Sequence, residues 1–371
     1  MNGDGRNPAG AKAESESAPA PGRAAASAAG QSGPDRALDQ WRGLALLLVL
    51  ISHGFFFTNR VDGIGRVGVN LFFFISGILV FRSLSRGPQG FWTGARYFWV
   101  RRTRRLVPAK YFYLFAMAAL VLLVGQTVAP PDFRRSFFNS LPSSLLYYRN
   151  YYHGGIPGVR ENLTGHLWSL GCEMQFYLLA PLLYFAGGRT FARRVIVWGL
   201  LLAALMAGGV IWRSNMEIKY TFQVAAWPMM AGFFAQYLRE TFPRAATELA
   251  TPCAWAGALS LAALTPVLLL AGKNAVVLTG TPLVAGCLGC YLLGFAPRGR
   301  LGGAFHYLGN RTYSMYLWQQ PLTIGGLLPS WLHPFGSLLA VPLGALSFRY
   351  LEEPFMSKYH SGSKKPAAPP A

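Results

Sequence analysis

The chain is poor in charged residues, and acidic residues are the scarcer kind. Only 13% of its 371 residues are charged, whereas a soluble domain carries about 25%. Lys and Arg together number 34 against 14 Asp and Glu, which gives a formal net charge of +20. Apolar runs long enough to span a bilayer recur along almost the whole length. We therefore exclude a soluble domain and predict a polytopic membrane protein.

Cysteine is also scarce, which limits the metal and redox chemistry that the chain can support. The four cysteines, Cys172, Cys253, Cys287 and Cys290, all lie in or near apolar segments. Cys287 and Cys290 form a CxxC pair, but a second pair that would complete a metal site is missing from the sequence. We expect these cysteines to pack as small apolar side chains, and we expect no bound metal.

The apolar core of a signal peptide is missing as well. Residues 1–36 are rich in Ala, Gly, Pro and Ser and lack apolar periodicity, which predicts a disordered cytoplasmic tail. The first span must then act as its own insertion signal. Residues 357–371 are predicted to form a second disordered cytoplasmic tail, so that residues 37–356 make up the membrane domain.

Hydropathy predicts an all-α bundle of about ten transmembrane helices. Basic residues crowd the connection between positions 82 and 106, as in loops on the cytoplasmic side. This places both termini in the cytoplasm of a multi-pass protein of the cell (inner) membrane. The basic stretch is expected to meet anionic lipid headgroups of the bilayer or an acidic soluble co-substrate, and not nucleic acid. The predicted spans are 41–58, 67–82, 107–125, 167–186, 195–212, 220–238, 252–271, 275–296, 304–328 and 332–351.

Two ionisable residues of the first span carry the strongest functional signal. Arg42 and His53 are separated by ten residues, so on a helix they share one face and lie roughly 16 Å apart. An imidazole can accept a proton from a hydroxyl, and a guanidinium suits phosphate. A hydrogen bond to a neighbouring helix would explain His53 alone, and an interfacial position would explain Arg42 alone. The co-facial pair favours a functional role for both.

Two further groups of residues are candidates for the same site. Arg102 and Arg105 would be neighbours if their stretch is helical, and the cluster could neutralise phosphates or serve only as a topology signal. Glu173 enters an apolar span, where a carboxylate needs a partner. His53 or an arginine of the cluster could supply that partner. A structural ion pair and a role in the catalytic site are equally good explanations of Glu173.

Several motifs in order resemble the acyltransferase-3 family of integral membrane acyltransferases. Residues 38–43 read LDQWRG and look like the family's opening LDxLRG, and Arg42 and His53 fit its arginine, ten residues, histidine signature. Residues 68–79 are similar to its GVDLFFVLSGFLI stretch, and residues 101–108 to its arginine-rich run before a proline. Residues 168–177 resemble WSLSVEEQFY, 313–321 resemble YSLYLWHxP, and 351–355 fit a closing ExPF. Asn70, Met174 and Gln319 depart from the family's usual Asp, Glu and His.

The resemblance implies transfer of an acyl group, typically acetyl, from acyl-CoA to a hydroxyl of a saccharide or lipid-linked glycan. Arg42, Arg102 and Arg105 would hold the donor's phosphates, His53 would act as the base, and Glu173 would orient or balance the centre. Because the chain ends soon after the last span, we expect no extracytoplasmic esterase-like domain. Two alternatives stay open, which are a multi-span transporter or flippase of a glycan or lipid and an inert relative that binds a membrane partner.

Overall fold

The structure is a computed structural model that describes residues 33–54, 62–124, 131–152, 163–187, 190–212, 220–271, 297–323 and 328–356. Within these ranges the chain is helical and contains no strand, which agrees with the predicted fold class. The predicted span 275–296 and most of the two predicted tails lie outside the described residues. Helix α2 begins at Gly33, so the first helix takes in four residues that composition assigns to the tail.

The helices follow the apolar segments closely at some places and depart from them at others. Their bounds are α2 Gly33–Gly54, α3 Asp62–Ser85, α4 Phe91–Val124, α5 Pro131–Leu145, α6 Leu167–Ala186, α7 Phe191–Ile211, α8 Phe222–Ala225, α9 Trp227–Thr241, α10 Pro243–Ala271, α12 Gly299–Asn310, α13 Thr312–Leu322 and α14 His333–Ser347. Short turns η2 (Arg149–Tyr151) and η4 (Ser330–Leu332) precede α6 and α14, and a π-helical turn η5 (Phe348–Glu352) follows α14.

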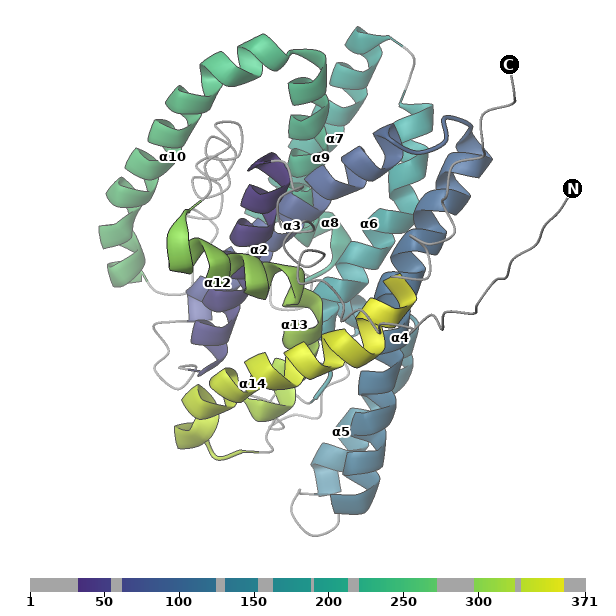
Figure 1. Ribbon diagram of the computed structural model, residues 1–371, viewed down its shortest axis with the longest axis vertical. Helices are drawn as coiled ribbons and strands as arrows, with labels where there is room; N and C mark the ends of the chain where they lie inside the picture. The colour runs from purple at the N-terminus through teal and green to yellow at the C-terminus, as the bar shows by residue number, and fades with distance from the viewer. Residues whose placement is uncertain are drawn as a thin grey trace, which may run out of the picture.

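Helices α2 and α3 form the centre of the bundle (Figure 1). Helix α4 runs along one side and α10 lies at the opposite side, while α12, α13 and α14 cross the face nearest the viewer. Helix α2 packs against α3, α12 and α14, and α3 packs in turn against α9 and α6. Residues of α2 are therefore surrounded by helices from both halves of the chain.

Paired glycines let the central helices approach closely. A Cβ atom on Gly77 of α3 would lie 2.0 Å from the carbonyl oxygen of Met229, and one on Gly232 of α9 would lie 1.9 Å from that of Phe74. The two helices thus touch backbone to backbone, as small residues allow in membranes. Helices α2 and α12 meet in the same way, because Gly309 lies directly against the carbonyl of Asp39. These contacts fix α2 relative to its neighbours.

The basic connection predicted between positions 82 and 106 is largely helical. Helix α4 begins at Phe91 and not near position 107, so the predicted start of this span is wrong. Pro108 lies inside the helix. Because the arginines between 101 and 105 belong to this helix, their side chains are held on a rigid element.

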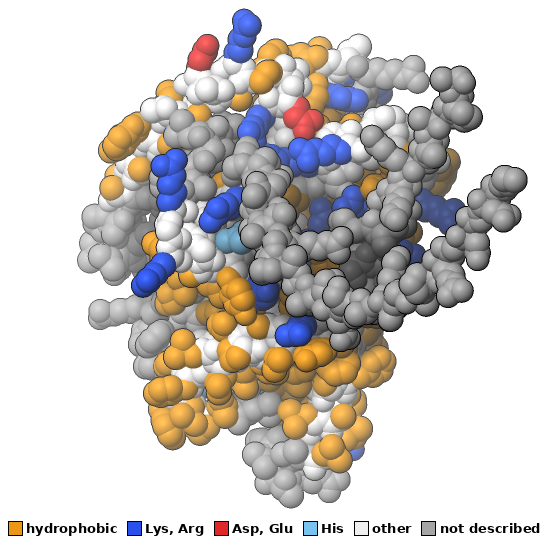
Figure 2. All heavy atoms as spheres, in the orientation of Figure 1, with side chains coloured by type: hydrophobic (Ala, Val, Ile, Leu, Met, Phe, Trp, Pro, Cys, Tyr) orange, Lys and Arg blue, Asp and Glu red, His pale blue; other side chains and the backbone are white. Residues whose placement is uncertain are grey.

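Other span boundaries also need correction. The predicted span 304–328 is two helices, α12 and α13, with a break at Arg311, and the predicted span 220–238 divides into α8 and α9. Three helices of the described residues are long and apolar enough to cross a membrane: Ile64–Ser85, Phe91–Leu123 and Phe191–Gly209. The number of about ten transmembrane helices remains a prediction. Basic side chains gather on the upper half of the face shown in Figure 2, and hydrophobic ones cover the lower half.

Candidate active site

Helix α2 carries both residues of the predicted signature. Arg42 and His53 lie within one uninterrupted helix, Gly33–Gly54, as the sequence predicts. Arg42 is buried, and its guanidinium lies 3.9 Å from the carboxylate of Asp39 and 5.6 Å from the centre of the Phe72 ring. Asp39 also lies 3.6 Å from His306 of α12. The Arg42 side chain is therefore oriented by an acidic neighbour on its own helix and by an aromatic ring of α3.

An arginine-lined cavity of about 360 Å³ lies between α3, α4 and the residues that follow η5. We call it the arginine cavity. Arg102 is held above the Tyr177 ring, 5.0 Å from its centre, and Arg105 lies one helical turn further along α4. So many guanidinium groups around one space favour a ligand that carries several negative charges. Its basic lining residues are Arg82, Arg86, Arg101, Arg102, Arg104 and Arg105.

Glu173 lies among these arginines. Its carboxylate accepts hydrogen bonds from Ser76 of α3 and from Tyr177 of α6, and the residue is buried. It lines the same narrow cavity as Arg42, Arg102 and Arg105. Of the two partners that the sequence offers for Glu173, arginines of the cluster line the same cavity as its carboxylate, and His53 does not. Ser76 and Tyr177 thus supply the two hydroxyls that anchor this carboxylate.

A second carboxylate, Glu352 of η5, faces Arg105. The two side chains lie 4.0 Å apart, and Ser314 of α13 donates a hydrogen bond of 2.6 Å to Glu352. Glu352 is fully buried beyond the end of the last predicted span. Burial raises the pKa of its carboxyl group, while Arg105 and Ser314 act in the opposite direction. Sequence reasoning missed this residue, although it belongs to the closing ExPF motif.

Two narrow cavities continue from the arginine cavity along α2. The middle cavity shares Leu79, Arg102 and Arg105 with the arginine cavity and also contains Arg42. The inner cavity shares Phe72, Glu173 and Tyr313 with the middle one. Each of these two has a volume of about 20 Å³, which is room for about one water molecule. Each cavity therefore shares lining residues with the next, from the arginines into the bundle.

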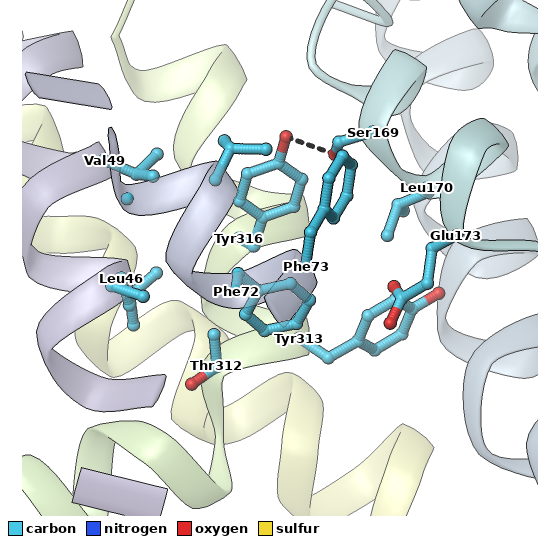
Figure 3. A pocket seen from close by; sticks show the side chains of 13 residues that line it. Leu46, Val49, Phe72, Phe73, Ser169, Leu170, Glu173, Thr312, Tyr313 and Tyr316 are labelled. Carbon is cyan, nitrogen blue, oxygen red and sulfur yellow. Dashed lines mark hydrogen bonds between the residues drawn. The ribbon is translucent and has the colours of Figure 1, made fainter. Parts of the chain in front are cut away.

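The inner cavity leads towards His53. Leu46 and Val49 of α2 line one side of it, and Ser169 of α6 and Tyr316 of α13 line another (Figure 3). The side chains of Ser169 and Tyr316 are joined by a hydrogen bond of 2.7 Å. Val49 precedes His53 by four residues, so the two side chains lie on one face of α2. The face that carries Arg42 and His53 is therefore the face that lines the cavities.

His53 itself contacts Gln319 of α13. The Nδ1 atom of the imidazole lies 2.5 Å from Oε1 of the Gln319 amide. His53 is partly buried and Gln319 is fully buried. The sequence places Gln319 where the resembling family often has histidine, and this departure alone gave no reason to connect it with His53. The contact joins the two residues across 266 positions of the chain.

The structure divides the predicted site residues into two groups. Arg42, Arg102, Arg105 and Glu173 surround the middle cavity. His53 lies at the far end of α2, beyond the inner cavity and beside Gln319. Among the described residues, no group of three or more His, Cys, Asp or Glu side chains could hold a metal ion. The predicted CxxC pair lies outside the described ranges.

Comparison with known proteins matches most of the chain to a single family. The family model described as "Acyltransferase domain" (Acyl_transf_3) covers residues 35–348. The chain is similar to the "O-acetyltransferase OatA" of Staphylococcus aureus (strain NCTC 8325 / PS 47), with 23% identity over 86% of this chain and 57% of that protein. It is also similar to the "Putative peptidoglycan O-acetyltransferase YrhL" of Bacillus subtilis (strain 168), with 26% identity over 86% of this chain and 55% of that protein.

A third relative is the "Peptidoglycan O-acetyltransferase OatA" of Listeria monocytogenes serovar 1/2a (strain ATCC BAA-679 / EGD-e), with 25% identity over 85% of this chain and 55% of that protein. The chain thus spans a little over half the length of these relatives. No solved structure gives a significant match.

Proposed function

Because the chain belongs to the acyltransferase-3 family, we propose that it transfers an acetyl group from acyl-CoA to a hydroxyl of a saccharide or lipid-linked glycan. We place it in the cell (inner) membrane as a multi-pass protein with both termini in the cytoplasm. The names of the relatives mention O-acetyltransferase activity and, for two of them, peptidoglycan. Family membership also favours an enzyme over the transporter or flippase that the sequence leaves open.

The main support for the proposal is the series of three cavities that leads towards His53 of α2. It begins at an arginine-lined space, passes Arg42, and ends one helical turn from His53. A donor with a phosphate-rich head at one end and a thin, flexible thioester arm at the other has the complementary charge pattern. The rise of the helix gives roughly 16 Å between Arg42 and His53, a distance that such an arm can span.

The arginines bind and position the donor in this proposal. Arg42, Arg102 and Arg105 hold its phosphates through charge-assisted hydrogen bonds, which are stronger than neutral ones. Glu173 balances the charge of the buried arginines and fixes Ser76 and Tyr177 beside them. The middle and inner cavities are too narrow for the arm unless side chains that line them, such as Phe72 and Tyr313, move aside.

His53 performs the proton transfer. One of its ring nitrogens removes the proton from the acceptor hydroxyl as the oxygen attacks the carbonyl carbon of the thioester. The new C–O bond forms, the C–S bond breaks, and the imidazolium gives its proton to the leaving thiolate. His53 is then neutral again, and the products are the acetylated acceptor and free thiol. Holding both substrates at one end of a rigid helix favours the reacting geometry.

Purified protein in nanodiscs, assayed for acetyl transfer from acetyl-CoA to a glycan acceptor, tests the proposal. We expect His53→Ala to abolish transfer while protein yield and thermal stability stay close to those of the wild type. His333→Ala is the matched control, because His333 lies at the start of α14 and bonds the carbonyl of Leu328, away from the cavities. Full transfer by His53→Ala would remove the proposed base. A mass shift of surface glycans between cells with and without the protein would identify the acceptor.

A further inference from the structure

The contact between His53 and Gln319 determines which ring nitrogen can act as a base. A neutral imidazole has one nitrogen that carries a proton and one that accepts, and the hydrogen bond of the first decides the form present. Oε1 of Gln319 can only accept a hydrogen bond. Because it lies 2.5 Å from Nδ1 of His53, Nδ1 must carry the proton, and Nε2 keeps its lone pair for the reaction.

The surroundings of Gln319 indicate that this amide is not retained for packing. Gln319 is fully buried on α13, and its Nε2 group has no hydrogen-bond partner among the described residues. A buried polar group without a partner lowers stability, and an apolar side chain of the same size would avoid that loss. Among the described residues, the one side-chain hydrogen bond of this amide is with the proposed base.

Helix α13 holds Gln319 in place from both sides. Its Tyr313 hydroxyl donates a hydrogen bond of 2.5 Å to the carbonyl of Leu106 on α4, and its Tyr316 hydroxyl donates one of 2.8 Å to the carbonyl of His166. Helix α13 also packs against α2 and α14. The amide therefore belongs to a helix whose position is fixed by hydrogen bonds and packing. A group that orients a catalytic base requires such support.

We propose that Gln319 is a positioning residue that holds His53 in the tautomer with the proton on Nδ1, so that Nε2 serves as the general base. This inference rests on the proposed role of His53. In metal and triad sites a neighbouring acceptor orients the reactive histidine in the same manner. An amide turned the other way would donate to Nδ1, force the proton onto Nε2 and leave His53 unable to accept from the acceptor hydroxyl.

Two substitutions separate this role from simple packing. Gln319→Leu removes the acceptor, and we expect kcat to fall roughly 10- to 100-fold, as for other partners of reactive histidines, with an unchanged KM for acetyl-CoA. Gln319→Glu retains an acceptor, so we expect most of kcat to remain. A carboxylate beside the imidazole favours its protonated form, so the acidic limb of the profile of kcat/KM against pH should move to higher pH. His166 is a titratable neighbour of His53 among the described residues, and it is present in every variant.

Gln320→Leu is the matched control, because Gln320 is equally buried at the next position of the same helix. We expect it to keep the kcat and the pH profile of the wild type, with thermal unfolding showing that all variants fold. Nitrogen-15 NMR of histidine-labelled protein, assigned with His53→Ala, reports the tautomer directly, and we expect the His53 proton on Nδ1 and its loss from there in Gln319→Leu.

Each outcome bears on one claim. A wild-type kcat and pH profile for folded Gln319→Leu, or a His53 proton on Nε2 in the wild type, would overturn the positioning role while leaving His53 as the base. Transfer by His53→Ala would instead overturn the proposed function and this inference with it.

Discussion

Glu352 lies 4.0 Å from Arg105 and is held in that position by a hydrogen bond from Ser314. A buried carboxylate thus faces an arginine that lines both the arginine cavity and the middle cavity. In the absence of a donor this carboxylate partly neutralises Arg105. A phosphate that binds Arg105 must compete with it, so Glu352 is expected to weaken donor binding as well as to position the guanidinium.

We therefore expect Glu352→Gln to lower the KM for acetyl-CoA several-fold. The amide oxygen can still accept the hydrogen bond from Ser314, but the negative charge beside Arg105 is gone. Burial already raises the pKa of Glu352, so its charged form is disfavoured in the folded protein, and removing the charge should not lower the thermal stability. Steady-state kinetics and thermal unfolding check both points. The control is Glu353→Gln, at the exposed position that follows Glu352, and it should change neither the KM nor the thermal stability. A raised KM for Glu352→Gln would contradict the idea that Glu352 competes with the donor's phosphates for Arg105.

Arg105 should act on the donor's phosphates and not on the chemical step. Loss of a hydrogen bond to a charged group costs about 1.5–3 kcal/mol, so we expect Arg105→Ala to raise the KM for acetyl-CoA roughly 10- to 100-fold. Arg105→Lys should restore only part of the affinity for acetyl-CoA, because an ammonium group lacks the planar fork of the guanidinium. Arg244→Ala, an exposed arginine of α10, is the control for net charge.

The same variants can be assayed with acetyl-pantetheine, which carries the thioester arm without phosphates. We expect Arg105→Ala and the wild type to use this donor equally well. An equal loss with both donors would show that Arg105 does not recognise phosphate.

Glu173 should support the arginines and not take the proton of the acceptor. Its carboxylate accepts from both Ser76 and Tyr177 at the same oxygen, Oε1, and the amide oxygen of Glu173→Gln could accept both bonds. The substitution removes the negative charge near the buried arginines and brings an N–H group into a buried site. A buried donor without an acceptor costs about 1–3 kcal/mol, so we expect a lower melting temperature and an altered KM for the donor. The kcat and its pH dependence should stay close to those of the wild type. A collapse of kcat with an unchanged KM would instead make Glu173 part of the reacting centre.

The sequence predicts the first helix of the site well and its partners poorly. Arg42 and His53 lie on a single helix whose periodicity and motif are both local, so their shared face follows from spacing alone. The position of Glu173 around the same cavity as Arg42 and Arg102, in contrast, depends on how α2, α4 and α6 pack. Spacing within a segment carries no such information, which is why His53 and the arginines were equal candidates to pair with Glu173.

Helix α13 is a second example of a feature that depends on tertiary contacts and that the sequence does not predict. It places Ser314 on Glu352 near the arginines and Gln319 on His53 beyond the inner cavity, so a single short helix touches both ends of the site. Hydropathy predicts one span over 304–328, because both α12 and α13 are apolar. The break at Arg311, where the two helices separate, depends on tertiary contacts that a window of hydropathy does not detect.

The close contact between α2 and α12 should control the position of Arg42. A Cβ atom on Gly309 would lie 1.7 Å from the carbonyl oxygen of Asp39, so Gly309→Ala must push α12 away from α2 and separate His306 of α12 from Asp39, the residue that orients Arg42. We expect lower thermal stability and a raised KM for the donor. Gly303→Ala is the matched control on the same helix, because a Cβ atom there meets nothing within 4 Å.

Alanine in an open helical position is favoured over glycine by about 0.5–1 kcal/mol, so Gly303→Ala should be neutral or stabilising. If both variants behave alike, the close approach of α12 does not position Arg42.

The size of the inner cavity should determine which acyl group is accepted. At about 20 Å³ it leaves little room beside the reacting carbon, and this favours acetyl over longer chains. Leu46→Ala enlarges the cavity lining, and each buried methylene contributes about 0.8 kcal/mol, so we expect the ratio of kcat/KM for butyryl-CoA over acetyl-CoA to rise roughly tenfold. Leu50→Ala is the matched control, because Leu50 packs in the same apolar cluster as Leu46 but does not line the cavity.

Both alanine variants should lose about 2–5 kcal/mol of stability, as buried leucines do. Only the change in acyl preference should separate them, because it depends on the space beside His53 and not on the packing of the core. An equal shift in both variants, or none in Leu46→Ala, would mean that the acyl group does not enter the inner cavity, and the path of the donor arm along α2 would have to be abandoned.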